Sequence, residues 1–188
     1  RADEQGISRG GARRDLAVLF TDIRGYTEFS ESVPPEVVVE MLNLYLDTQT
    51  RIVKSHGGDI DKFIGDALVA VFDGDGKEAR AVASGLEIQA AMQGLLDERP
   101  DWNLQIGIGI ASGVVVLGAM GAQDRMDFTV LGSTVNLAAR LCSKAEAGAI
   151  LVNTSVREAA APGGVAARFT ALDPIPLKGY AEPVTAYE

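Results

Sequence analysis

The chain has 188 residues, of which 47% are hydrophobic, and it carries 17 basic and 26 acidic side chains for a net charge of -9. This length suits one compact domain with an ordinary core, whereas the charge argues against broad affinity for nucleic acid or an anionic membrane, because both would repel it. The single cysteine, Cys142, excludes an intramolecular disulfide.

Residues 1–13 are polar and contain glycine, which predicts a linker that leads into a single domain over residues 14–188. The segment lacks the apolar core of a signal peptide, and no apolar run approaches the roughly 20 residues that span a bilayer. The missing initiator methionine and the abrupt end at AYE suggest a module cut from a longer protein. We expect a cytoplasmic domain without direct membrane contact, in a parent protein that is free or membrane-attached.

The first half of the chain predicts a strand, a helix and a hairpin. The strand is expected over Asp15–Thr21. An amphipathic helix follows, with Pro34 and Pro35 tolerated in its first turn and its end at His56 before two glycines. The stretch GGDIDKFIGDALVAVFDGDG then predicts two short strands around a tight turn at Gly65.

The second half begins with a helix over Lys77–Asp97, whose buried stripe is expected to contain Ala79, Val82, Leu86, Ala90, Met92 and Leu96. Apolar residues from Leu104 to Ile110 then alternate with Gln105, Gly107 and Gly109, which predicts a strand whose glycine face lets another backbone or a ligand come close. A third helix is expected from Thr134 to Ala145, and short strands near Ile150–Asn153 and Val184–Tyr187. The order strand, helix, strand, strand, helix, strand predicts an α+β fold with a ferredoxin-like βαββαβ core and helices on one face.

Two acids stand where neighbouring strands of this fold are expected to end. Asp22 ends the first strand and Asp66 lies at the bend of the hairpin, so the two carboxylates can converge. Convergent carboxylates without histidine or cysteine suit hard divalent ions such as Mg²⁺, which share their coordination shell with substrate phosphates. The alternative is structural: Asp22 would cap the short helix TEFS, and Asp66 would be an ordinary turn residue.

Three further polar residues are candidates for substrate binding. Asn136 and Arg140 lie four residues apart, so they share one helical face, and an amide beside a guanidinium can donate several hydrogen bonds to phosphate oxygens. Both are also ordinary helix residues, so NLAAR alone does not assign a site. Lys62 is equally open, because it is either a solvated lysine or a donor to a base.

Four stretches occur in order along the chain: FTDIRGYTEFS, GGDIDKFIGDALVAVF, RMDFTVLGSTVNLAARL and PLKGYAEPVTAYE. In order and spacing they resemble the catalytic domain of class III nucleotidyl cyclases, over about residues 13–188. The resemblance implies that Asp22, Asp66 and the carbonyl of Ile23 hold two divalent cations, Mg²⁺ or Mn²⁺. It also implies that Lys62 donates to adenine N1 and that Asn136 orients the ribose. Arg140 would contact the α-phosphate, and Lys178 would hold the distal phosphates. Phe63, next to Lys62, is expected either to pack in the protein or to touch the purine.

Position 129 departs from the commonest pattern of this family. Many of its adenylyl cyclases carry an aspartate there, which accepts a hydrogen bond from the adenine amino group, whereas the hydroxyl of Thr129 can accept as well as donate. Guanylyl cyclases usually replace the lysine by glutamate, and Lys62, which offers only donors, would oppose guanine. The pairing of Lys62 with Thr129 resembles the class IIIb subgroup, many members of which are stimulated by bicarbonate.

The implied reaction is intramolecular: the ribose 3′-hydroxyl of ATP attacks its own α-phosphorus and gives 3′,5′-cyclic AMP and pyrophosphate. In the family the site lies between two chains of a head-to-tail homodimer, so Asp22 and Asp66 of one chain would meet Lys62, Thr129, Asn136 and Arg140 of the other. The alternatives are a guanylyl cyclase, a non-catalytic nucleotide-sensing dimerisation module, and a diguanylate cyclase. The last is suggested by Gly57-Gly58-Asp59, although Ile60 stands where that signature has Glu-Phe.

Overall fold

The computed structural model describes residues 11–122, 125–160, 169–176 and 186–187. Its strands are β1 (Ala12–Arg24), β2 (Asp59–Ile64), β3 (Ala67–Phe72), β4 (Gln105–Ala122), β5 (Arg125–Leu131), β6 (Ile150–Asn153) and β7 (Ala186–Tyr187). Its helices are α1 (Tyr26–Ser32), α2 (Pro35–Ser55), α3 (Lys77–Glu98), α4 (Ser133–Lys144) and α5 (Thr154–Ala160). In this described part of the chain, no helix is long and apolar enough to cross a membrane.

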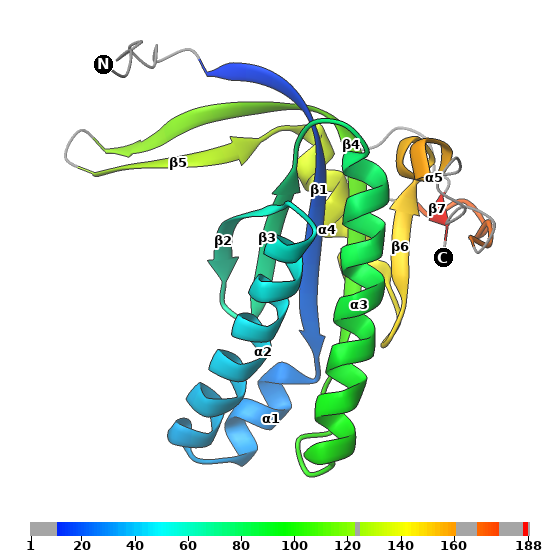
Figure 1. Ribbon diagram of the computed structural model, residues 1–188. Helices are drawn as coiled ribbons and strands as arrows, with labels where there is room; N and C mark the ends of the chain where they lie inside the picture. Colours follow the sequence, from blue (N-terminus) through cyan, green and yellow to red (C-terminus); the bar gives the residue numbers. More distant parts are fainter. Residues whose placement is uncertain (1–10, 123–124, 161–168, 177–185, 188) are drawn as a thin grey trace.

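The strands form one seven-stranded sheet in the order β2-β3-β1-β4-β6-β7, with β5 paired to β4 outside this path (Figure 1). β1 lies between β3 and β4 and is antiparallel to both, and β6 is parallel to β4. The order of the first four strands and the two long helices between them is that of a ferredoxin-like core. The predicted α+β fold with additional C-terminal elements is therefore confirmed.

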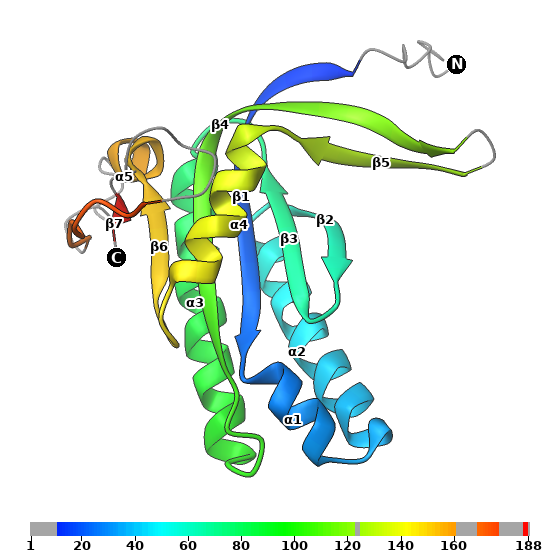
Figure 2. The ribbon, with the colours of Figure 1, turned by 180° about the vertical axis from the view of Figure 1, so that it is seen from behind.

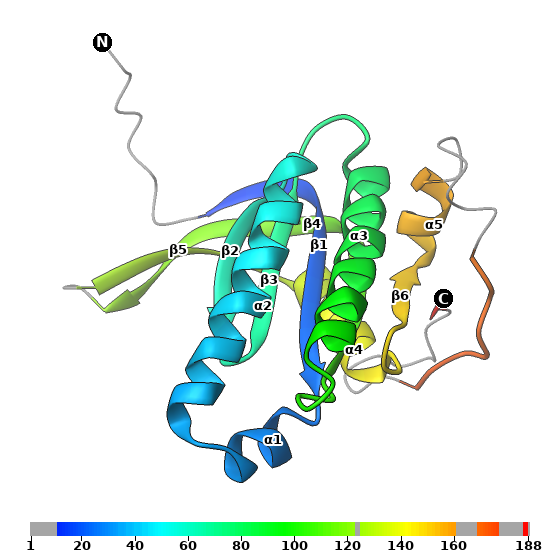
Figure 3. The ribbon, with the colours of Figure 1, turned by 60° about the horizontal axis from the view of Figure 1, so that its bottom comes forward.

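The helices lie on both faces of the sheet. α2 and α3 lie side by side over one face (Figures 1 and 3), where the core includes Leu19, Ile108 and Ile110. α4 covers the opposite face (Figure 2), where Leu141 packs in a second cluster with Val18. The expectation of helices on one face holds for the two long core helices, while α4 provides the second apolar layer.

Two glycines of β4 allow α4 to lie against the sheet. A Cβ atom at Gly109 would overlap the backbone of Ala138 and Cys142, and one at Gly107 would overlap the guanidinium of Arg24. The alternation of apolar residues and glycines in this strand had predicted such a close approach. The glycine face of β4 therefore sets the distance between α4 and the sheet.

The largest difference from the sequence predictions is the hairpin formed by β4 and β5. We expected this strand to end at Ile110, whereas β4 continues to Ala122 and pairs with β5 through the register Val116 with Leu131 to Ala122 with Arg125. The hairpin projects beyond the body of the sheet (Figures 1 and 2). Its outer part is mostly exposed, so the sequence there lacks the apolar periodicity that marks a half-buried strand.

The buried face of α3 also differs from the predicted stripe. Leu86 is 43% exposed, whereas Ile88 and Gly85 are buried. A Cβ atom at Gly85 would lie 3.3 Å from the Ile150 side chain and 3.5 Å from that of Ile110. Val82 and Met92 of the predicted stripe are buried, whereas Ala90 is exposed like Leu86, so the buried face of α3 is rotated from the predicted one and includes small residues such as Gly85.

Replacing Gly109 tests whether α4 packs directly against the backbone of β4. Gly109→Ala should lower the free energy of unfolding by about 1–3 kcal/mol, because the added methyl group forces α4 away from β4. Urea denaturation measures this change. Gly94→Ala is the control, because a Cβ atom there meets nothing within 4 Å and alanine is the better helix former. A Gly109→Ala protein as stable as the wild type would contradict this account of the packing.

Candidate active site

Asp22 and Asp66 lie together at one end of the sheet. The backbone N–H of Ile23 donates a hydrogen bond to Asp66 Oδ2 at 3.0 Å. Gly65, with φ of 59°, makes the tight turn that presents Asp66, since this left-handed conformation favours glycine. The two acids line a pocket of about 290 Å³ together with Ile23, Gly25, Tyr26, Thr27 and Glu28.

The electrostatics of this pocket favour a cation. Burial raises the pKa of Asp22 from 3.8 to about 6, and a hydrogen bond to Asp66 and the negative charge of Asp66 add to the rise, whereas Arg24 opposes it. No group of three or more His, Cys, Asp or Glu residues suited to a metal occurs within the described residues. Mg²⁺ needs only one or two carboxylates when substrate phosphates complete its shell, so two acids fit such an ion.

The structure does not show Asp22 as a helix cap. α1 begins at Tyr26, and its N-cap residue is Gly25, with no side-chain capping hydrogen bond. The structural alternative for Asp22 is therefore wrong. Asp66 does lie at a turn, as both interpretations required, and it also accepts the hydrogen bond from Ile23.

Arg24 connects Asp22 to α4. Its Nη1 lies 3.5 Å from Asp22 Oδ2, and its Nη2 donates to the carbonyl oxygen of Ala145 at 2.9 Å and to that of Cys142. These carbonyls belong to the C-terminal end of α4, where a cation is favoured. Burial raises the pKa of the Cys142 thiol to about 12, so Cys142 is a core residue and not a reactive thiol.

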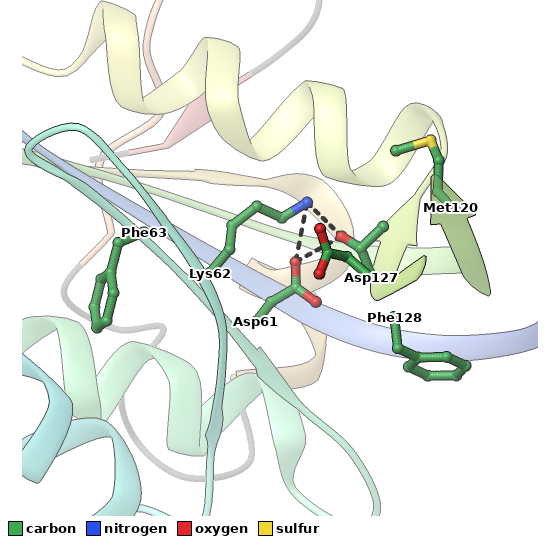
Figure 4. A pocket seen from close by; sticks show the side chains of 7 residues that line it. Asp61, Lys62, Phe63, Met120, Asp127 and Phe128 are labelled. Atoms are coloured by element: carbon green, nitrogen blue, oxygen red, sulfur yellow. Dashed lines mark hydrogen bonds and ion pairs between the residues drawn. The ribbon is translucent and has the colours of Figure 1, made fainter. Parts of the chain in front are cut away.

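A second pocket, of about 470 Å³, lies between β2 and the β4–β5 hairpin and contains Lys62 and Thr129 (Figure 4). Lys62 Nζ donates to Thr129 Oγ1. The hydroxyl of Thr129 donates to Asp61 Oδ2 at 3.0 Å, and Lys62 Nζ lies 3.3 Å from the same oxygen. The structure thus places the two expected base-recognition residues in direct contact within one chain.

Asp61 was not among the predicted site residues. An acid between Ile60 and Lys62 resembles a solvated strand residue, but only 8% of its side chain is exposed. Phe63 also lines this pocket, although its ring is 50% exposed and points away from Lys62 and Asp61 (Figure 4).

Asn136 and Arg140 lie on α4, whose start is anchored by a 3.0 Å hydrogen bond from Thr134 Oγ1 to the carbonyl oxygen of Val114. Asn136 is exposed and Arg140 is partly buried, and neither lines the two pockets described above. Lys178 lies outside the described residues. The described part of one chain therefore brings together the two acids, and separately Lys62 with Thr129.

The pKa of Asp22 leads to a stability prediction. A carboxyl group whose pKa is raised by folding contributes stability that is fully present below pH 3.8 and is lost as the pH rises through about 6. At pH 8, without divalent cations, Asp22→Asn should therefore raise the free energy of unfolding. The gain should be on the order of 1 kcal/mol, since solvent screens a side chain that is 39% exposed.

Urea denaturation in EDTA at pH 8 and at pH 4.5 measures this effect, and the gain should shrink at the lower pH. Asp47→Asn, which removes an acid that is 70% exposed and paired with Arg51 on α2, is the matched control and should show no such gain. A loss of stability at pH 8 in Asp22→Asn, or an equal gain at both pH values, would contradict the prediction.

Comparison with known proteins places this geometry in a family. The family described as the adenylate and guanylate cyclase catalytic domain matches residues 11–187. An adenylate cyclase of Anabaena cylindrica is 36% identical over 98% of this chain and 38% of its own length. An uncharacterized protein of Mycobacterium tuberculosis is 35% identical over 97% of this chain and 34% of its own length. The chain thus spans little more than a third of these relatives.

Solved structures agree with this match. The adenylyl cyclase CyaB from P. aeruginosa has a TM-score of 0.84 at 34% identity, covering 94% of this chain and 93% of that one. The guanylyl cyclase Cya2 has a TM-score of 0.83 at 34% identity, covering 95% and 92%. The chain belongs to the family of adenylate and guanylate cyclase catalytic domains.

Proposed function

We propose that this domain is an adenylyl cyclase, which converts ATP to 3′,5′-cyclic AMP and pyrophosphate. The observation that carries the proposal is the contact of Lys62 with Thr129 in one pocket. Adenine presents an acceptor, N1, beside a donor, its amino group, and an ammonium beside a hydroxyl oxygen offers the complementary pair. Guanine presents a hydrogen at N1, which the ammonium of Lys62 would oppose.

Asp22, Asp66 and the carbonyl of Ile23 are the proposed ligands of two divalent cations, Mg²⁺ or Mn²⁺. The raised pKa of Asp22 supports this assignment. Burial, and after it the neighbouring Asp66, disfavours the ionised form of Asp22, and a bound cation would offset that cost. Bound cations would lower the pKa of the ribose 3′-hydroxyl and neutralise charge on the triphosphate.

The protein's own groups would act by positioning and by charge. In the reaction a bond forms between the 3′-oxygen and the α-phosphorus, the bond to the pyrophosphate oxygen breaks, and the 3′-hydroxyl proton is lost. Asn136 would orient the ribose, and Arg140, which is charged at any working pH, would stabilise the charge that develops on the α-phosphate. Lys178 is proposed to hold the distal phosphates, by the resemblance of PLKG to the family motif.

The proposed active form is a head-to-tail homodimer. Neither Asn136 nor Arg140 lines the pocket of the two acids, so a second copy is the proposed source of these groups. Exposed apolar side chains on β2 and on both faces of the β4–β5 hairpin support an interface that involves these strands: Phe63, Ile64, Val114, Met120, Met126, Phe128 and Leu131. Exposed apolar surface of this kind marks association surfaces in soluble proteins.

Guanylyl cyclase activity is the second candidate function. Its support is that Cya2 and CyaB match this chain with the same identity of 34%, so overall similarity does not select the base. Lys62 is the residue that argues against it, because an ammonium cannot accept from the N1 and N2 hydrogens of guanine.

Product analysis separates these functions. The purified domain is incubated with ATP or GTP and with Mg²⁺ or Mn²⁺, with and without bicarbonate, and cyclic nucleotides are quantified by chromatography. We expect cyclic AMP from ATP, with a loss of at least about a hundredfold in Asp66→Ala, since this acid is a proposed ligand of the cations. Cyclic GMP as the main product would favour the second candidate. No cyclic product from a dimeric sample would favour a nucleotide-sensing module.

Mixing two inactive variants tests the shared site. Asp22→Ala and Arg140→Ala homodimers should each be inactive, whereas their mixture should regain up to about a quarter of the wild-type activity, because one of the two sites in each heterodimer keeps all its groups. Cyclic AMP formation is measured after subunit exchange, with dimerisation checked by light scattering. No recovery at any mixing ratio, in samples shown to form heterodimers, would rule out a site shared between chains.

A further inference from the structure

Asp61 is a partly buried acid to which the proposed mechanism gives no role. Its Oδ2 atom accepts from the Thr129 hydroxyl at 3.0 Å and lies 3.3 Å from Lys62 Nζ, so one carboxylate oxygen serves both base-recognition residues. Only 8% of the Asp61 side chain and 5% of Thr129 are exposed, which limits competition from water.

Counting hydrogens fixes the direction of every bond in this cluster (Figure 4). An ionised carboxylate has no hydrogen and an ammonium has no acceptor, so the only hydrogen of the Thr129 hydroxyl must be donated to Asp61. The hydroxyl oxygen then accepts from Lys62 with one lone pair and keeps one for a ligand. Lys62 donates one hydrogen to Asp61 and one to Thr129, and keeps a third for a ligand.

We propose that Asp61 is a positioning residue that fixes the Thr129 hydroxyl as an acceptor and thereby makes this pocket selective for adenine over guanine. The inference rests on the proposed function and deepens it. A free threonine hydroxyl could rotate and donate to the carbonyl oxygen at position 6 of guanine. With its hydrogen held by Asp61, Thr129 offers that oxygen only a lone pair, whereas it accepts readily from the adenine amino group.

The backbone of β2 explains how two consecutive residues reach one threonine. Side chains alternate between the faces of a regular strand, so Asp61 and Lys62 should point apart. The register between β2 and β3 shifts here, because Ile60 pairs with Ala70 and Lys62 with Val69. A bulge of this kind leaves Asp61 as the extra residue and redirects its side chain. The irregularity in β2 thus brings the acid and the lysine to the same hydroxyl.

The test compares variants that differ in their acceptor at position 61. Asp61→Ala removes the acceptor, and Asp61→Leu, which fills a similar volume without one, replaces it if the alanine protein does not fold. Asp61→Asn keeps an oxygen that can accept from both Thr129 and Lys62 while it removes the charge. Asp59→Ala, an exposed acid on the same strand, is the control for the loss of one negative charge.

Selectivity is measured as the ratio of kcat/KM for ATP to that for GTP, and as the ratio of affinities for 3′-deoxy-ATP and 3′-deoxy-GTP, which lack the attacking hydroxyl. We expect both ratios to fall about tenfold or more in Asp61→Ala, the size of effect that one hydrogen bond supplies. Asp61→Asn and Asp59→Ala should keep most of the selectivity. In a Thr129→Val background, removal of Asp61 should change either ratio much less, because Asp61 acts on selectivity mainly through the hydroxyl.

If Asp61 had a purely structural role, its removal would lower kcat/KM and affinity equally for both nucleotides and leave the ratios unchanged. That outcome would overturn the inference. An undiminished effect of Asp61→Ala in the Thr129→Val background would overturn it as well. The proposed function fails separately: wild-type protein that binds 3′-deoxy-ATP but forms no cyclic AMP from ATP is not an adenylyl cyclase. The affinity ratios would then still decide the role of Asp61.

Discussion

The closeness of two carboxylates at the end of β1 is the constraint on which the candidate site depends. β1 pairs directly with β3, so the turn before β3 brings Asp66 to the residues that follow Thr21. Burial makes ionisation of Asp22 costly and raises its pKa, and the hydrogen bond to Asp66 and the charge of Asp66 add to the rise. Arg24 offsets only part of the cost of negative charge at this end of the sheet. A ligand that brings positive charge would offset the rest and would therefore be favoured there.

The position of α4 depends on that same end of the sheet. Its helix axis can approach β4 because Gly109 has no side chain, and its last carbonyls accept from Arg24, which also contacts Asp22. One guanidinium therefore contacts both Asp22 and the end of α4. Asn136 and Arg140, the groups proposed for the site with the second copy, project from the same helix.

Local sequence patterns predicted the helices and strands of the core. They did not predict the exposed β4–β5 hairpin or the direction of the Asp61 side chain. The helix that ends before Gly57 and the turn at Gly65 follow from residues whose conformational preferences need no tertiary contact. The β4–β5 hairpin carries exposed apolar residues such as Met120, so burial periodicity could not reveal it. Asp61 escaped prediction because its direction is set by a bulge, and a bulge in β2 becomes visible only when its pairing with β3 is known.

In the proposed site, Thr129 and Asp61 together would provide the chemistry that a single aspartate provides in many adenylyl cyclases of this family. An aspartate at position 129 would present an acceptor whatever its neighbours do, whereas a hydroxyl presents one only when something takes its hydrogen. Asp61 takes it, and as an anion it also balances the charge of Lys62 when the pocket is empty. Placing the negative charge on Asp61, behind the hydroxyl of Thr129, has a cost and a benefit. In the proposed complex the acceptor facing the base would be neutral and therefore weaker, but the carboxylate would stay paired with Lys62 and would not need to be desolvated anew when a nucleotide enters.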